Sequence, residues 1–75
     1  MNRIRRNKLH AIYDRLQVLQ EELEDLLEEE EEARDNIPES FTERWEAAEE
    51  TCSTLEEAVD NISDAADLLL EAAEA

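Results

Sequence analysis

The sequence predicts an all-α protein, a two-helix antiparallel hairpin packed like a coiled coil. Three observations support this prediction. Apolar residues recur every three or four positions in two long segments, a proline separates the segments, and glycine is absent from all 75 residues. The composition is rich in leucine, alanine and glutamate, which favour helices. We therefore expect one domain, residues 1–75, with a first helix over about 3–35, a turn over 36–40 and a second helix over 41–74.

The first helix is predicted by an apolar series with the spacing of one side of a coiled-coil helix. Its members are Leu9, Ile12, Leu16, Leu19, Leu23, Leu26, Ala33 and Ile37, with Glu30 as the one polar member. Steps of three and four alternate, which is the heptad spacing that keeps one face of a helix against a neighbour.

The second helix is predicted by a longer series without a polar break. Its members are Phe41, Trp45, Ala48, Cys52, Leu55, Val59, Ile62, Ala66, Leu69 and Ala73. A line of small residues flanks this series at seven-residue spacing and consists of Thr51, Ala58, Ala65 and Ala72. Small side chains there would let the two helices approach closely.

The turn is predicted by Pro38, which cannot continue a helix and disfavours helical backbone at Ile37. Ser40 and Glu43 have the spacing of a capping box at the start of the second helix. Asn36 offers a competing cap, and we prefer Ser40. A connection this short makes the two helices antiparallel neighbours.

The apolar series also predict a register in which the numbers of facing residues sum to 78, as for Leu23 with Leu55. Cys52 then lies opposite Leu26 and should be a buried structural thiol. We expect Phe41 and Trp45 to be core anchors that close the turn. An exposed tryptophan beside acidic residues, which would suit a binding hot spot, is the alternative.

One hairpin buries little apolar surface. Tyr13, Val18, Leu27, Leu68 and Leu70 remain outside the two series. For a scaffold of this size the stabilisation from burial and the entropic cost of ordering are nearly equal. We therefore expect a homo-oligomer, most simply a four-helix bundle of two hairpins, or coverage of the apolar surface by a partner.

The chain is strongly acidic, with 23 acidic and 7 basic residues and a net charge of -16. Such a charge repels nucleic acid and anionic lipid, so we predict neither as a partner. No run approaches the roughly 20 apolar residues needed to cross a bilayer. A single cysteine permits no internal disulfide and suits a reducing compartment, which predicts a cytoplasmic location.

The residues for catalysis or metal binding are missing. The chain has no Glu-x-x-His pair of the kind found in di-iron bundles, and an EF-hand loop needs a glycine, which the chain lacks. Phosphate-binding loops also need glycine. We predict no enzyme activity, no cofactor and no metal site.

The candidate site is a partner-binding surface formed by the acidic run and the acidic start of the second helix. Its predicted residues are Glu21, Glu22, Glu24, Asp25, Glu28, Glu29, Glu30, Glu31, Glu32, Glu43, Glu46, Glu49 and Glu50. Along a rod of about 50 Å, the carboxylates would be roughly 2 Å apart, close to the phosphate spacing of duplex DNA. We expect docking on a basic surface of another protein. The alternative is a structural, self-assembling hairpin whose charge only maintains solubility.

Nearly the whole chain resembles a group of small acidic proteins from bacterial and prophage genomes, particularly those of gut Firmicutes. The similarity rests on the segments LQEELEDLLEEEEEARDNIPES and ERWEAAEETCSTLEEAVDNISDAADLLLEA, and above all on the turn 35–39. The resemblance implies a phage protein, for which an inhibitor of host nucleic-acid enzymes or defence complexes is expected. It implies no catalytic or binding residues of its own.

Overall fold

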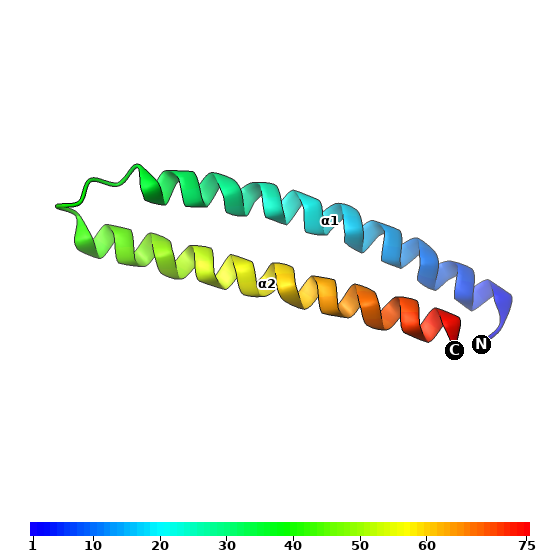
Figure 1. The fold of residues 1–75 in the computed structure, drawn as a ribbon. Helices are drawn as coiled ribbons and strands as arrows, with labels where there is room; N and C mark the ends of the chain where they lie inside the picture. The colour runs from blue at the N-terminus through cyan, green and yellow to red at the C-terminus, as the bar shows by residue number, and fades with distance from the viewer.

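The computed structural model describes all 75 residues as two antiparallel α-helices joined by a short turn (Figure 1). Helix α1 spans Arg3–Asp35 and helix α2 spans Thr42–Glu74. The helices lie side by side, both termini are at the same end, and the Cα atoms extend over 59 × 15 × 10 Å. The prediction of an all-α antiparallel hairpin is confirmed. Neither helix has a stretch long and apolar enough for a membrane crossing.

The end of the rod that holds the termini is closed by contacts that suit the two helix ends. Asn2 caps α1, because its side-chain oxygen accepts a hydrogen bond from the Arg5 backbone N–H at 2.9 Å. Arg6 Nε donates to the Ala73 carbonyl oxygen at 2.6 Å. That carbonyl belongs to the last turn of α2, where no helical N–H follows and where positive charge is favoured. The basic start of α1 thus stabilises the end of α2.

At the opposite end of the rod, the N-cap of α2 differs from the predicted one. Phe41 N–H donates to the Pro38 carbonyl oxygen at 2.9 Å, which makes Pro38–Phe41 a β-turn. Ser40 lies inside this turn, and the N-cap of α2 is Phe41, without a side-chain hydrogen bond. The predicted Ser40 capping box is therefore wrong. The Asn36 alternative is also wrong, because Asn36 is the C-cap of α1.

The core is a line of α2 residues that face α1. Four residues are buried, and all belong to α2: Cys52, Val59, Ala66 and Ala73. The facing line on α1 consists of half-buried residues, namely Tyr13, Gln20, Leu27 and Arg34. We call these two lines together the seam. Half-buried leucines border it on α1 at positions 9, 16 and 23.

The register is close to the predicted one. Arg6 contacts Ala73, and the Arg34 guanidinium lies over the Trp45 ring, so the residue numbers sum to 79 in both contacts. The predicted sum was 78. A sum of 79 places Tyr13 opposite Ala66, a large side chain facing a small one.

The rotation of α1 differs from the prediction. Ile12, Leu19 and Leu26 were expected in the seam, but they are 43%, 50% and 52% exposed. In each case the next residue takes the seam position. The apolar surface of α1 is wider than one neighbouring helix can cover, so part of it stays outside. The small Ala66 of α2 leaves room for Tyr13, which is larger than Ile12, and this favours the observed rotation.

Candidate protein-binding surface

The hairpin has two long faces of opposite character, one on each side of the seam. Side chains advance by about 100° per residue, so residues seven apart form a line along a helix. On both helices, the residues that directly precede the seam are apolar or small, and most of those that directly follow it are acidic. The two helices face each other and run antiparallel. The residues that follow the seam positions therefore lie on one side of the hairpin in both helices, and the residues that precede them lie on the other side. Each helix therefore contributes to both faces.

The acidic face is formed by exposed carboxylates from both helices. From α1 it contains Asp14, Glu21, Glu28 and Asp35. From α2 it contains Glu46, Asp60, Asp67 and Glu74, bordered by the outer line Glu43, Glu50, Glu57, Asp64 and Glu71. All of these side chains are exposed, so the face runs along most of the rod.

The predicted site residues do not form one surface. Eleven of the thirteen are exposed, whereas Glu31 and Glu49 are half-buried between the helices. The structure brings Glu21 and Glu28 together with the acids of α2. It places a second group on the other side of α1, consisting of Glu22, Glu29 and Glu30. A run of twelve consecutive residues makes more than three helical turns and must surround the helix.

Several residues of the acidic face were missed by the sequence prediction. They are Asp14, Asp35, Glu57, Asp60, Asp64, Asp67, Glu71 and Glu74. A seven-residue period in the carboxylates themselves would have found most of them. In α2 this period is visible from Glu43 through Glu50 to Glu71.

Most carboxylates have no ion-pair partner within the hairpin. The only salt bridges join Arg34 to Asp35 at 3.0 Å and to Glu49 at 2.6 Å. The hydrogen bond to Asp35 raises the pKa of Arg34, and the bond to Glu49 acts in the same direction. The remaining acidic side chains are free to contact basic groups of another molecule.

The aromatic residues near the turn are more exposed than predicted. Phe41 is 47% exposed and Trp45 is 41% exposed, so the expectation that they are core anchors is wrong. Arg34 occupies the seam where an apolar residue would be needed to bury the indole. Its guanidinium lies 5.9 Å from the centre of the Trp45 ring, and that of Arg44 lies 5.4 Å from the centre of the Phe41 ring. Both distances suit cation–π contacts.

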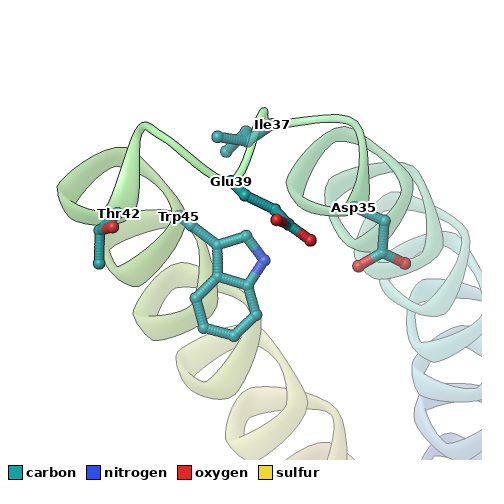
Figure 2. Close-up of a pocket in the computed structure, with 5 residues that line it drawn as sticks. All are labelled: Asp35, Ile37, Glu39, Thr42 and Trp45. Atoms are coloured by element: carbon teal, nitrogen blue, oxygen red, sulfur yellow. The ribbon is translucent and has the colours of Figure 1, made fainter.

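A shallow groove opens beside Trp45 at the turn. It is lined by Asp35, Ile37, Glu39, Thr42 and Trp45. Figure 2 shows the indole ring standing at its centre, with the carboxylates of Glu39 and Asp35 on the side of the ring nitrogen. The groove thus combines an apolar ring with negative charge, which suits a cationic side chain of a partner.

Cys52 lies in the seam and is 3% exposed, as expected for a buried thiol. Burial raises the pKa of this thiol, and nearby Glu31 and Glu49 add to the effect while Arg34 opposes it. A protonated, covered thiol is a poor nucleophile. His10 is exposed, and no group of three or more His, Cys, Asp or Glu side chains is placed to hold a metal ion.

The opposite side of the hairpin, which we call the apolar face, has apolar or small residues along its middle and carries the carboxylates Glu22, Glu29 and Glu30 on the α1 side. From α1 it contains Ile12, Leu19 and Leu26, and from α2 it contains Thr51, Ala58, Ala65 and Ala72. Leu68, which is 64% exposed, borders this face. The α2 residues of the apolar face include no carboxylate.

The fold and its surfaces define an acidic helical hairpin with one apolar side. Comparison of the chain with protein-family models, with curated proteins and with solved structures finds no match in any of the three.

Proposed function

We propose that the chain is a non-enzymatic, cytoplasmic protein-binding module whose acidic face docks on a basic surface of another protein. The observation that supports this proposal is the exposed row of carboxylates on one side of the hairpin. Arg34 is the only residue that forms salt bridges with acidic groups of the chain. An uncompensated row of like charges attracts a complementary surface over a long range and accelerates association.

The dimensions favour a partner that handles nucleic acid. The 23 carboxylates along the 59 Å rod give one charge per about 2.6 Å. Duplex DNA carries one phosphate per about 1.7 Å of its axis. A basic channel that accepts DNA would therefore also attract this hairpin. Together with the resemblance to prophage proteins, this favours an inhibitor of a nucleic-acid enzyme or of a defence complex.

Capture of partners from a bacterial lysate, followed by mass spectrometry, tests the proposal. The expected partner carries a basic surface and is released as salt rises from about 0.1 M towards 1 M, because screening shortens the reach of the charges. Nucleic acid or the basic partner's own substrate should compete with the hairpin. A partner retained equally at all salt concentrations would contradict docking by charge.

A matched pair of variants locates the docking surface. Glu21→Gln with Glu28→Gln removes two charges from the acidic face, whereas Glu22→Gln with Glu29→Gln removes two charges from the other side of α1. The first variant should lose the partner at lower salt than the wild type. The second should retain it. Equal weakening in both variants would show that only total charge matters.

The second candidate is a structural hairpin that assembles with itself and uses its charge only for solubility. The exposed side chains of Ile12, Leu19 and Leu26 favour this alternative. It predicts a defined oligomer that retains no partner from the lysate. The mass of that oligomer should not change when Glu21 and Glu28 are neutralised.

A further inference from the structure

The apolar face exposes side chains that a single hairpin cannot cover. Leu19 and Leu26 are about half exposed, at 50% and 52%, although they belong to the heptad pattern of α1. The neighbouring part of α2 offers threonine and alanine, which leave the leucines uncovered. Large apolar side chains that are exposed on one side of a protein often mark an interaction site.

The size of this face suits a stable dimer. With Cα extents of 59 Å along the rod and 15 Å across it, the whole side of the hairpin that carries the apolar face projects an area of about 900 Å². Stable protein interfaces bury about 800 Å² per partner. Contact along this whole side, with the apolar residues in its middle part and charged residues around them, would therefore be sufficient for a dimer.

Charges along the edge of the apolar face specify the direction of a second copy. Lys8, Arg15, Glu22 and Glu29 form an exposed line at seven-residue spacing, with two positive residues followed by two negative ones. If a second α1 runs antiparallel across the face, Arg15 meets Glu22 of the other copy and Lys8 meets its Glu29. Each pair then occurs twice. With both turns at one end, α1 would instead lie across the partner's α2, where the corresponding edge line consists of the uncharged residues Ala47, Thr54, Asn61 and Leu68.

The apolar line of α1 and the small-residue line of α2 have their midpoints at nearly the same height along the rod. The apolar line of α1 is centred on Leu19, between Ile12 and Leu26. The small-residue line of α2 is centred between Ala58 and Ala65. The hairpin register, in which facing residue numbers sum to 79, places residue 60 opposite Leu19. The two centres differ by less than two residues, about 2–3 Å along the helix, so one two-fold axis serves both helices.

We propose that the apolar face binds a second copy of this chain, in a two-fold symmetric four-helix bundle whose two turns lie at opposite ends. Leu19 packs against its own symmetry mate on the axis, and the alanines of the two α2 helices face each other. The two acidic faces point outward on opposite sides of the bundle. Dimer formation uses the face opposite to the docking surface and does not depend on the proposed function.

Sedimentation equilibrium at micromolar concentration tests the dimer. The wild type should have twice the mass of the 8.7 kDa chain. Leu19→Glu should shift the population to monomer, because it places a charge on the symmetry axis. Val18→Glu is the matched control, since Val18 is 56% exposed and points away from α2. It should remain dimeric. A monomeric wild type, or a larger oligomer, would overturn the proposal.

Cysteine cross-linking tests the geometry and does not require a folded monomer. In a Cys52→Ala background, Leu19→Cys should form a disulfide-linked dimer under mild oxidation, and Val18→Cys should not. Spin labels on Ser40→Cys in the same background should be separated by a distance close to the 59 Å length of the hairpin. A label distance of about 20 Å or less would place both turns at one end and overturn the opposite-end arrangement.

A charge swap tests the pairing between copies. Arg15→Glu alone should raise the dimer Kd about three- to tenfold, because two exposed pairs become repulsive. The double variant Arg15→Glu with Glu22→Arg restores opposite charges across the axis and should recover the wild-type Kd. Failure of the double variant to recover would contradict the assigned pairs, whether or not the acidic face docks on another protein.

Discussion

The two helices have equal length but bury different kinds of residue. Helix α2 buries Cys52, Val59, Ala66 and Ala73 in the interface, whereas α1 has no buried residue. The buried residues of α2 are small enough to be covered by the longer side chains of α1. Those longer side chains extend beyond the contact and remain half exposed on the outside. In a structure of only two helices, side-chain size therefore decides which residues are buried.

This difference predicts that the largest loss of stability follows a substitution at the most buried position. Ala66 is 0% exposed. Ala66→Leu inserts three additional carbons between the helices, and overpacking of this kind costs about 1–3 kcal/mol. The measurement is urea unfolding at one fixed protein concentration, because association would change the apparent stability.

Ala11→Leu is the control for this substitution, because Ala11 lies exposed on the outer side of α1. Its effect should stay within about 0.5 kcal/mol. If both variants unfold at the same urea concentration as the wild type, Ala66 is not enclosed between the helices.

A smaller loss of stability is expected when an apolar side chain of α1 is truncated. Leu16 is half-buried beside the seam. Leu16→Ala should lower the free energy of unfolding by about 1–2 kcal/mol, less than a fully buried leucine would lose. Val18→Ala, two residues away on the outer side, should change it by less than about 0.5 kcal/mol. Equal losses in the two variants would contradict the packing of Leu16 against α2.

The hairpin and the register of α2 could be predicted because periodic spacing and Pro38 are local signals. The seam of α2 follows the predicted series, since Cys52, Val59 and Ala66 are the buried residues. The rotation of α1 could not be predicted from periodicity alone. Two adjacent lines compete for the seam, an apolar one through Ile12 and one through Tyr13 that also contains the polar Gln20 and Arg34. The choice between them depends on which line packs better against the small residues of α2.

The N-cap of α2, the surroundings of Trp45 and the arrangement of the acidic residues could not be predicted from residue spacing alone. The spacing of Ser40 and Glu43 fits a capping box, but the β-turn that begins at Pro38 includes Ser40 and removes it from the capping position. Trp45 fits the apolar series, but the facing residue in the folded protein is Arg34. The acidic run was treated as one surface, although a helix distributes its consecutive residues around its axis.

The pH dependence of stability provides a third test of enclosure in the seam. Burial raises the pKa of the Cys52 thiol, so the folded state retains the thiol proton at pH values where the unfolded state has lost it. The free energy of unfolding should therefore fall as pH rises above about 8.5, the ordinary thiol pKa, until the folded-state pKa is reached.

Cys52→Ala isolates this contribution from other groups that titrate in the same range. The melting temperature of the wild type should fall relative to that of the variant above about pH 8.5, and the difference should be constant at lower pH. A difference that does not change with pH would show that the thiol is accessible to water.

The smallest expected effect concerns the charged residue in the seam. Arg34 lowers the pKa of the Cys52 thiol, in opposition to burial and to the carboxylates of Glu31 and Glu49. Arg34→Gln removes this positive charge and should raise the thiol pKa further. The rate of alkylation by iodoacetamide as a function of pH measures the change, because only the thiolate reacts.

Arg44→Gln is the matched control, because Arg44 lies over Phe41 at the exposed turn and forms no salt bridge. It removes the same charge from the same end of the hairpin, so any general effect of net charge is present in both variants. Only Arg34→Gln should move the alkylation profile to higher pH. If both variants move it equally, the thiol senses the overall field of the acidic chain. In that case Arg34 has no specific effect on the Cys52 thiol.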